Sequence, residues 1–134
     1  MSISVLDACS LIAYLRGEEG AAIVDRLLRD PGRECLVHAV NLCEDYYQLI
    51  RDSDEATARQ AIGDLQAVGL IVRSDIDEPF WREVGQLKAR GRISLADCFC
   101  VALAVRVSGQ VVTSDHGEFD PLVPLGLCSI LFIR

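Results

Sequence analysis

The chain has 134 residues, of which 51% are hydrophobic and 25% are charged, and these values are typical of a single globular domain covering residues 1–134. Its formal net charge of −7 at pH 7 argues against broad affinity for nucleic acid, although it leaves room for a nucleic-acid substrate bridged by metal ions. No apolar run approaches the roughly 18 residues of a membrane span and no basic leader opens the chain, so we expect no membrane association and a cytoplasmic location.

Short hydrophobic runs alternate with helix-like patterns along the whole chain. The runs that predict strands are residues 2–6, 34–38, 70–72, 111–114 and 128–133. The segments that predict helices are residues 8–15, 18–29, 41–50, 55–67, 79–89 and 94–107, and a turn-rich loop is expected over residues 115–121. This alternation predicts an α/β fold in three layers, with helices on both faces of a central, mostly parallel five-stranded sheet.

The six cysteines lie in apolar stretches of a chain that is long enough to build a core without disulfide bonds. We therefore expect buried free thiols at Cys9, Cys35, Cys43, Cys98, Cys100 and Cys128. No Cys-x-x-Cys spacing occurs, and the thiols of Cys98 and Cys100 leave their helix in different directions, which argues against a zinc site.

Four acidic residues occupy similar places at the junctions between predicted elements. Asp7 follows the first strand and Asp115 follows the fourth, whereas Glu44 and Asp97 each lie in the first turn of a helix. In a parallel sheet with right-handed connections, strand ends and the helix starts that follow them share one edge. We therefore expect the four carboxylates to converge.

Asp97 has a second interpretation. The segment from Ser94 to Asp97 fits a capping box, in which Ser94 caps the helix and Asp97 reaches back to a backbone N–H near the positive helix end. Taken alone, this spacing favours the capping role. Three further acids at matching junctions favour a shared site instead.

Converging carboxylates repel one another, so either some of them hold a proton at a raised pKa or a cation neutralises them. Mg²⁺ and Mn²⁺ are the natural counter-ions because they prefer oxygen ligands, and the lack of histidine in the set argues against zinc. One such ion, or two about 4 Å apart, would activate water and stabilise the leaving oxygen of a phosphodiester. The pattern therefore predicts metal-dependent phosphodiester hydrolysis.

Four motifs resemble those of PIN-domain nucleases in order and spacing, over the whole chain. They are Val5-Leu6-Asp7-Ala8-Cys9-Ser10-Leu11-Ile12, Asn41-Leu42-Cys43-Glu44, Ser94-Leu95-Ala96-Asp97-Cys98-Phe99 and Val112-Thr113-Ser114-Asp115-His116-Gly117-Glu118-Phe119. The resemblance implies a compact PIN-like fold around a parallel sheet. It also implies that Asp7, Glu44, Asp97 and Asp115 are the catalytic, metal-binding acids, with Mg²⁺ or Mn²⁺ as cofactor.

Many small PIN domains are VapC-like toxin ribonucleases, so the resemblance further implies an RNA substrate, an antitoxin partner and a homodimer. Ser10 and Thr113 match positions where the family often has a hydroxyl near the site, and roles in a turn or cap fit them equally well. The aromatic residues Tyr46, Tyr47 and Trp81 suit either a dimer contact or the core. The alternative from another class is a non-catalytic PIN-like module that binds RNA or protein.

A short basic segment before Asp97 supplies candidate RNA contacts in a chain that is acidic overall. The candidates are Arg82, Lys88, Arg90 and Arg92. A solvated helix face explains the same pattern equally well.

Two other acidic α/β designs do not fit the sequence. A phosphoacceptor receiver domain needs a lysine after its fifth strand, but the only lysine of this chain is Lys88. A phosphatase with an aspartyl nucleophile would carry a second aspartate two residues after Asp7, where this chain has Cys9.

Overall fold

The computed structural model describes residues 1–134 as strands that alternate with helices. The strands are β1 (Ser2–Leu6), β2 (Arg33–His38), β3 (Leu70–Arg73), β4 (Gln110–Thr113) and β5 (Ser129–Phe132). The helices are α1 (Ala8–Arg16), α2 (Ala21–Arg29), α3 (Ala39–Asp52), α4 (Glu55–Ala67), α5 (Glu78–Arg90), α6 (Leu95–Val107), α7 (His116–Phe119) and the 3-10 helix η1 (Asp120–Leu125). None of these helices has the length and apolar character needed to cross a lipid bilayer.

The strands form one sheet in the order β3-β2-β1-β4-β5, and every pairing between neighbours is parallel. The expected α/β sheet is confirmed, and it is entirely rather than mostly parallel. β1 occupies the centre, where Val5 lies opposite Leu36 of β2 and Val111 of β4. Because all strands run in the same direction, their carboxyl ends lie at one edge of the sheet.

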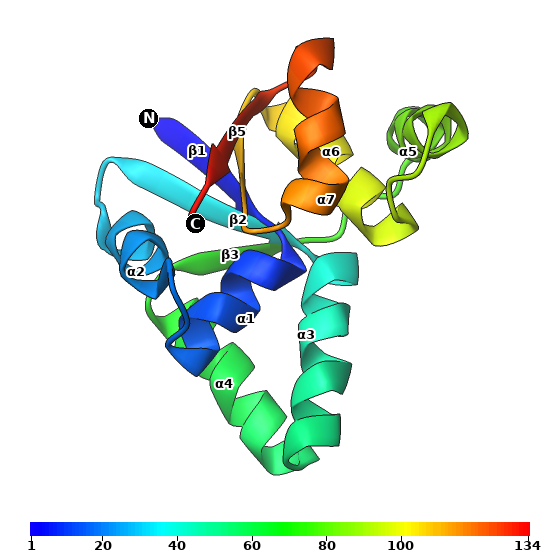
Figure 1. The fold of residues 1–134 in the computed structure, drawn as a ribbon. Coiled ribbons are helices and arrows are strands. Elements are labelled where there is room, and N and C mark those ends of the chain that lie inside the picture. The colour runs from blue at the N-terminus through cyan, green and yellow to red at the C-terminus, as the bar shows by residue number, and fades with distance from the viewer.

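The side chains of each central strand alternate between two hydrophobic cores. Val5 and Val111 are buried against α5 and α6 on one face, whereas Leu6 and Val112 are buried against α1, α2 and α4 on the other. Figure 1 shows α1 to α4 on one side of the strands and α5 and α6 on the other. Burial on both faces explains why the strands read as continuous apolar runs, and it confirms the three-layer prediction.

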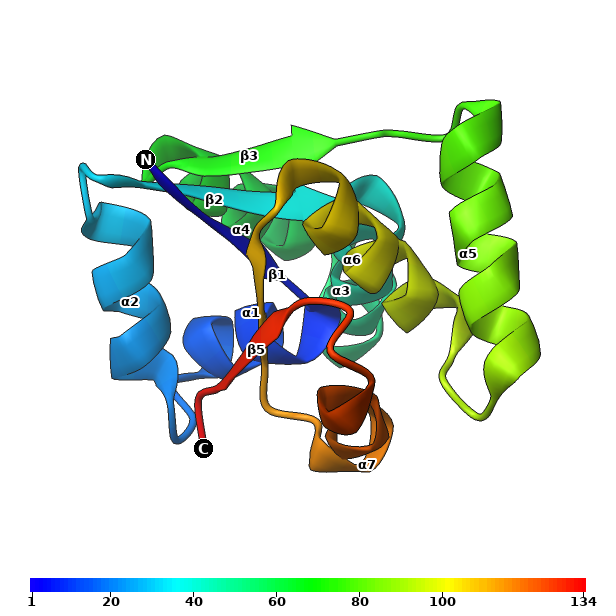
Figure 2. The ribbon, with the colours of Figure 1, turned by 90° about the horizontal axis from the view of Figure 1, so that it is seen from above.

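α6 is the central helix of its layer. It packs against β1, β2 and β4, and its residues Cys98, Val101 and Leu103 are completely buried. α5 packs mainly against α6, and Figure 2 shows it standing outside α6, away from the strands. The apolar composition of α6, which lacks a solvent-facing stripe, therefore follows from its place between the sheet and α5.

Two expected boundaries were wrong. Residues 115–121 form α7 and the first turn of η1 rather than a loop, because the Asp115 side chain accepts a hydrogen bond from the Glu118 N–H and so caps a short helix. The tetrad that begins at Asn41 does not open α3. That helix starts at Ala39, and the Nδ1 atom of His38 accepts the N–H of Val40 at 3.1 Å in place of a conventional cap.

All six cysteines are free, as expected, but only Cys35, Cys98 and Cys100 are buried, whereas Cys128 is partly buried and Cys9 and Cys43 are exposed. Cys9 lies on the wall of a cavity, and Cys43 lies on the outer face of α3 beside a shallow apolar depression. Both residues lie on helices that bury one face against the core and turn the other away from it, so an apolar stretch of sequence there does not ensure burial.

Candidate active site

Asp7 lies in the turn between β1 and α1 and is completely buried. The backbone N–H of Ser10 donates to its Oδ1 at 2.8 Å, and the hydroxyl of Thr113, from the neighbouring strand β4, donates to its Oδ2 at 2.5 Å. The Ser10 hydroxyl donates to the Asp7 carbonyl oxygen at 3.1 Å. Both hydroxyl residues therefore hold Asp7 in place, and burial raises its pKa to about 6 despite these hydrogen bonds.

Asp97 lies in the first turn of α6, and the capping interpretation is only half correct. Ser94 does cap the helix, since its Oγ accepts the Asp97 N–H at 3.2 Å. The Asp97 carboxylate does not complete the box, because the Ser94 N–H instead donates to Oε2 of Glu118 at 2.9 Å. Burial, followed by the negative charge of Asp7, raises the pKa of Asp97 to about 7.

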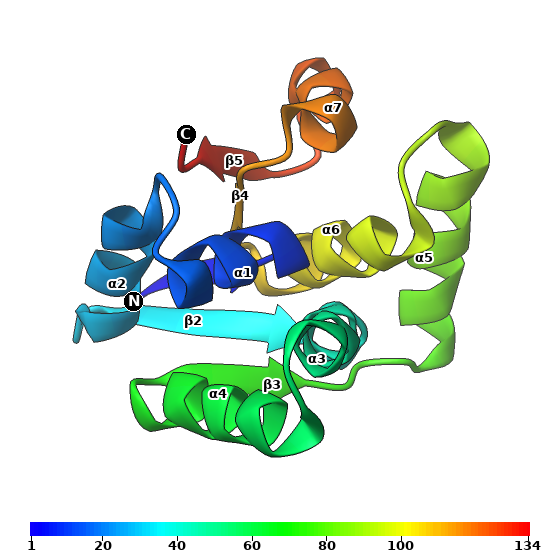
Figure 3. The same ribbon diagram turned by 60° about the horizontal axis from the view of Figure 1, so that its bottom comes forward.

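Glu44 and Asp115 complete the predicted set. Glu44 extends from the second turn of α3, and burial raises its pKa. The N–H of Asp115 donates to Thr113 Oγ1 at 3.0 Å, which places this residue directly beyond β4. In Figure 3, α1, α3 and α6 lie next to one another at this edge of the sheet.

The four predicted acids gather around one cavity of about 390 Å³. Glu44, Asp97 and Asp115 line it, and Asp7 lies buried directly behind the wall residues Ala8 and Cys9. Their charges act on one another, since Asp7 and Glu44 raise the pKa of Asp97 and Asp115 raises that of Asp7. The structure therefore places the four carboxylates in one electrostatic environment.

The sequence profile of the family described as PIN domain matches residues 4–120. The chain belongs to the PIN-domain family. That match spans all four acids, most of β1 and the whole of β2, β3 and β4. Among curated proteins, none matches the sequence.

Solved structures share the fold of this PIN domain over nearly its full length. DNA-bound VapBC from Salmonella typhimurium is 16% identical, with a TM-score of 0.76 and coverage of 100% of both chains. A toxin-antitoxin complex from Klebsiella pneumoniae is 14% identical, with a TM-score of 0.73 and coverage of 98% of both chains. VapC20 from Mycobacterium tuberculosis, a sarcin-ricin loop cleaving toxin, is 17% identical with a TM-score of 0.69, covering 90% of this chain and 95% of its own. At such identities these likenesses establish the fold.

Glu118 is a fifth acid of the PIN-domain site that the sequence analysis did not single out. It lines the same cavity, and its bond to the Ser94 N–H connects α7 with the start of α6. Its spacing of three residues from Asp115 is that of a helix-capping tetrad, which was the available signal. The carboxylate crosses to another helix rather than returning to its own, and only the tertiary structure reveals that.

Asp45 is a second acid that sequence analysis missed. It is completely buried beside Glu44 on α3, and neither of its carboxylate oxygens has a hydrogen-bond partner. Burial, then the charges of Asp7 and Glu44, raises its pKa to about 9. The amide oxygen of Asn41, one helical turn earlier, is also buried without a partner. An unpaired carboxyl group in this position is costly, because burial removes the water that would solvate it.

The four basic candidates have separate roles. Arg82 approaches Glu78 on the same helix at 3.7 Å, and the Lys88 ammonium donates to the carbonyl oxygen of Ile93 at 2.9 Å. Arg90 and Arg92 are exposed and form no ion pair, and both line a second cavity that meets the acidic one at Glu118. These two arginines are therefore the members of the predicted set that are both free and next to the site.

The acidic cavity has no dedicated counter-charge. Of its two wall arginines, Arg16 is paired with Asp52 outside the cavity, and Arg134 is paired with Glu18, a wall residue outside the predicted set of acids. The side chains that face one another here carry hard oxygen donors, which is the donor chemistry that Mg²⁺ and Mn²⁺ prefer. No three of the histidine, cysteine, aspartate and glutamate side chains are already arranged at metal-ligand spacing. The fit to a hard divalent ion therefore rests on donor type and on the uncompensated charge.

Proposed function

We propose that this PIN domain is a metal-dependent endoribonuclease and the toxin of a toxin–antitoxin pair. The observation that carries the proposal is the gathering of Asp7, Glu44, Asp97 and Asp115 around one cavity at the carboxyl edge of a PIN-domain sheet. Carboxyl groups whose pKa values are raised by burial, and further by neighbouring carboxylates, are characteristic of functional sites when they gather at a cleft.

The four acids would hold Mg²⁺ or Mn²⁺ and thereby bring the phosphate of an RNA strand to the acidic cavity. A bound ion of this kind supplies charge stabilisation for phosphate oxygens and a water of lowered pKa. Asp7 is the most rigid member, because Ser10 and Thr113 hold both of its carboxylate oxygens. Asp97 lies in the capped first turn of α6, so its backbone is held in place where its carboxylate reaches the cavity.

The likeness to solved toxin structures supports the biological part of the proposal. The neighbours include a toxin-antitoxin complex and a toxin described as cleaving the sarcin-ricin loop, and each shares nearly the whole fold of this chain. We therefore infer an antitoxin as the protein partner. A homodimer is also proposed, since Tyr47 and Trp81 expose 41% and 48% of their surface and are not core residues.

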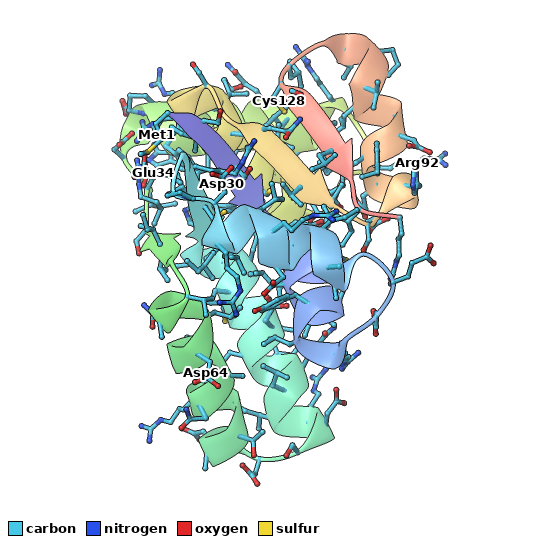
Figure 4. The ribbon with its side chains drawn as sticks, turned by 90° about the vertical axis from the view of Figure 1, so that its left-hand side faces the viewer. Met1, Asp30, Glu34, Asp64, Arg92 and Cys128 are labelled. Carbon is cyan, nitrogen blue, oxygen red and sulfur yellow. The ribbon has the colours of Figure 1, made fainter.

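The test is cleavage of end-labelled single-stranded RNA by the purified protein in Mn²⁺, in Mg²⁺ and in excess chelator. We expect cutting only with metal, and none by Asp7→Asn, which preserves side-chain shape and removes one charge. Asp64→Asn is the matched control, because Asp64 is an exposed carboxylate on α4, outside the site (Figure 4). Equal cutting in chelator, or equal cutting by Asp7→Asn, would contradict the proposal. Metal-stimulated RNA binding without cutting would favour the non-catalytic alternative.

A further inference from the structure

A second cavity adjoins the acidic one and differs from it in chemistry. It has a volume of about 180 Å³ and lies between the α5–α6 connection on one side and α7 with η1 on the other. Glu118 lines both cavities, so the two meet at that residue. A ligand that spans them would place one part among carboxylates and the next part in a different environment.

The walls of this second cavity are mainly apolar. Leu87 and Ile93 are buried at its base, and Leu122 and Leu125 of η1 form the opposite wall. The bond from Lys88 to the Ile93 carbonyl oxygen ties the α5–α6 connection to the end of α5, which fixes one wall. The volume is below the roughly 300–1,000 Å³ of sites for drug-sized ligands, so it suits a single ring system.

Two arginine side chains line this apolar cavity without an ion-pair partner. Arg90 and Arg92 line it, both are exposed, and neither is in an ion pair with any acid of the chain. Figure 4 shows the Arg92 side chain at the edge of the molecule, reaching outward beside the C-terminal helices. In an acidic protein, unpaired guanidinium groups at the border of an acidic cleft are suited to bind phosphate, which the carboxylates alone would repel.

We propose that the second cavity is a subsite for one nucleobase of single-stranded RNA, next to the phosphodiester that is cut, with Arg90 and Arg92 binding the flanking phosphates. The proposal rests on the ribonuclease function inferred above. An unpaired base presents a flat apolar face to the leucine-lined walls, whereas a paired base is enclosed within its helix. The subsite therefore gives the enzyme a preference for unpaired RNA and for the base adjacent to the cut.

The arginines are tested by RNA binding without cleavage. In the Asp97→Asn background with Mg²⁺, anisotropy of a labelled random-sequence RNA gives the Kd at several salt concentrations. Arg90→Ala and Arg92→Ala should each raise the Kd at least about fivefold and flatten the log–log salt dependence by about 0.7. Arg82→Ala removes the same charge from α5 at a residue that faces Glu78, and it should change neither value.

The apolar wall is tested by a matched pair in η1. Leu125 and Val123 expose 51% and 52% of their surface, but only Leu125 lines the cavity. In the otherwise native protein, sequencing of cleaved random RNA should show a base preference beside the cut. Leu125→Asp should abolish that preference, and Val123→Asp should retain it. Circular dichroism and light scattering would verify the fold and mass of each variant.

The outcomes separate the subsite from the proposed function. If the wild type cuts RNA and each test variant behaves like its control, the subsite is wrong and the ribonuclease function stands. If Arg90→Ala and Arg92→Ala weaken binding and Arg82→Ala does not, but the wild type does not cut in Mn²⁺, RNA binding at the second cavity stands and the catalytic function fails. A protein that neither binds nor cuts RNA would overturn both. A change of oligomeric mass in Leu125→Asp alone would assign the patch to a contact between copies and overturn the subsite.

Discussion

Two regions of this protein gather acidic side chains and treat them in opposite ways. Between β3 and α5, the guanidinium group of Arg106 donates to both Asp77 oxygens at 2.7 Å and to Asp75 at 3.0 Å. Arg73 donates to Asp75 as well, at 2.8 and 2.9 Å. The hydrogen bonds of Arg106 lower the pKa of Asp77 to about 2, and those of Arg73 lower the pKa of Asp75. These acids have partners and hold α6 to the start of α5.

At the carboxyl edge of the sheet the acids have no such partners. Burial raises the pKa of Asp7 to about 6, that of Asp97 to about 7 and that of Asp45 to about 9. A fold that is able to neutralise acids at one place leaves them uncompensated at another. Proteins accept that cost where a ligand supplies the missing charge, so the contrast between the two regions separates a structural use of aspartate from a functional one.

The largest difference between the regions is expected in catalysis. Asp97→Asn should lower the rate of RNA cleavage at least about 100-fold, since changes even to groups behind metal ligands cost about 10–100-fold. Asp77→Asn makes the same chemical change in the other region and should leave the rate within about twofold of wild type. Single-turnover cleavage assays in Mn²⁺ measure both. A wild-type cleavage rate in Asp97→Asn would show that Asp97 has only a structural role at the start of α6.

The pH dependence of stability should also distinguish the regions. The pKa values of Asp7 and Asp97 lie above their ordinary value of 3.8, so the folded state binds these protons more tightly than the unfolded state. The stabilisation that these two protonated groups contribute to the folded state is fully present below about pH 4 and is lost as pH rises through about 6 and 7. Between pH 5 and 8 these two groups should together lower the stability of the metal-free protein by on the order of 4 kcal/mol, and Asp45, whose pKa is raised to about 9, adds to that loss.

The Asp77 carboxyl group should change stability with pH in the opposite direction. Its folded-state pKa is lowered, so its contribution is present above about pH 4 and is lost as pH falls through about 2. Urea titrations at pH 5 and pH 8 in chelator should therefore give a smaller pH difference for Asp97→Asn than for wild type, and an unchanged difference for Asp77→Asn. A wild-type protein that is more stable at pH 8 would contradict the assignment.

A divalent ion should sharpen the contrast through thermal stability. At a concentration of 100 times its Kd, Mn²⁺ should stabilise the wild type by about 2.7 kcal/mol, because it binds only the folded state. The response should be smaller in Asp97→Asn, whose metal-free form should match wild type or exceed it by about 1 kcal/mol through relief of repulsion. Asp77→Asn should keep the full Mn²⁺ response on a lower starting melting temperature. Equal responses in all three proteins would show that the carboxylates do not form one site.

The smallest expected effect concerns Asp45. Asp45→Leu removes a buried carboxyl group that has no hydrogen-bond partner and puts a side chain of similar size in its place. In chelator the variant should be more stable than wild type by about 1–2 kcal/mol in urea unfolding. Asp75→Leu is the matched change in the other region, and it should lower stability because it leaves Arg73 and Arg106 without one acceptor. A destabilised Asp45→Leu would mean that the carboxyl group has a structural partner.

The fold could be predicted from the sequence because its signals are local. Apolar runs of strand length, turn residues and helix caps recur in alternation, and a parallel order of elements follows from that alternation. The two boundary errors occurred where a short-range helix cap was not recognised in the sequence, at His38 and at Asp115. α3 begins two residues early because the imidazole of His38 caps it, a role that ranks low among expected helix caps.

The candidate site could also be predicted from the sequence only in part. Asp7 and Asp115 could be found from the sequence because each directly follows a buried strand, and Glu44 and Asp97 because each was expected in the first turn of a helix at the same edge, which holds for Asp97 but not for Glu44, in the second turn of α3. Positions of this kind depend on chain direction alone, since parallel strands must end together. The sequence by itself therefore determined the class of fold and four of the acids at this edge, but not Glu118 or Asp45.

Only the tertiary structure decided how those acids are partnered. Glu118 reaches the Ser94 N–H across 24 positions of the chain, and Asp45 is buried by the packing of α3 rather than by its own neighbours in sequence. The same is true of the basic segment, where Arg82 faces Glu78 while Arg90 and Arg92 reach a cavity wall. Burial and pairing arise from segments far apart in the chain, and both set the free energy of a charge, so no local pattern encodes them.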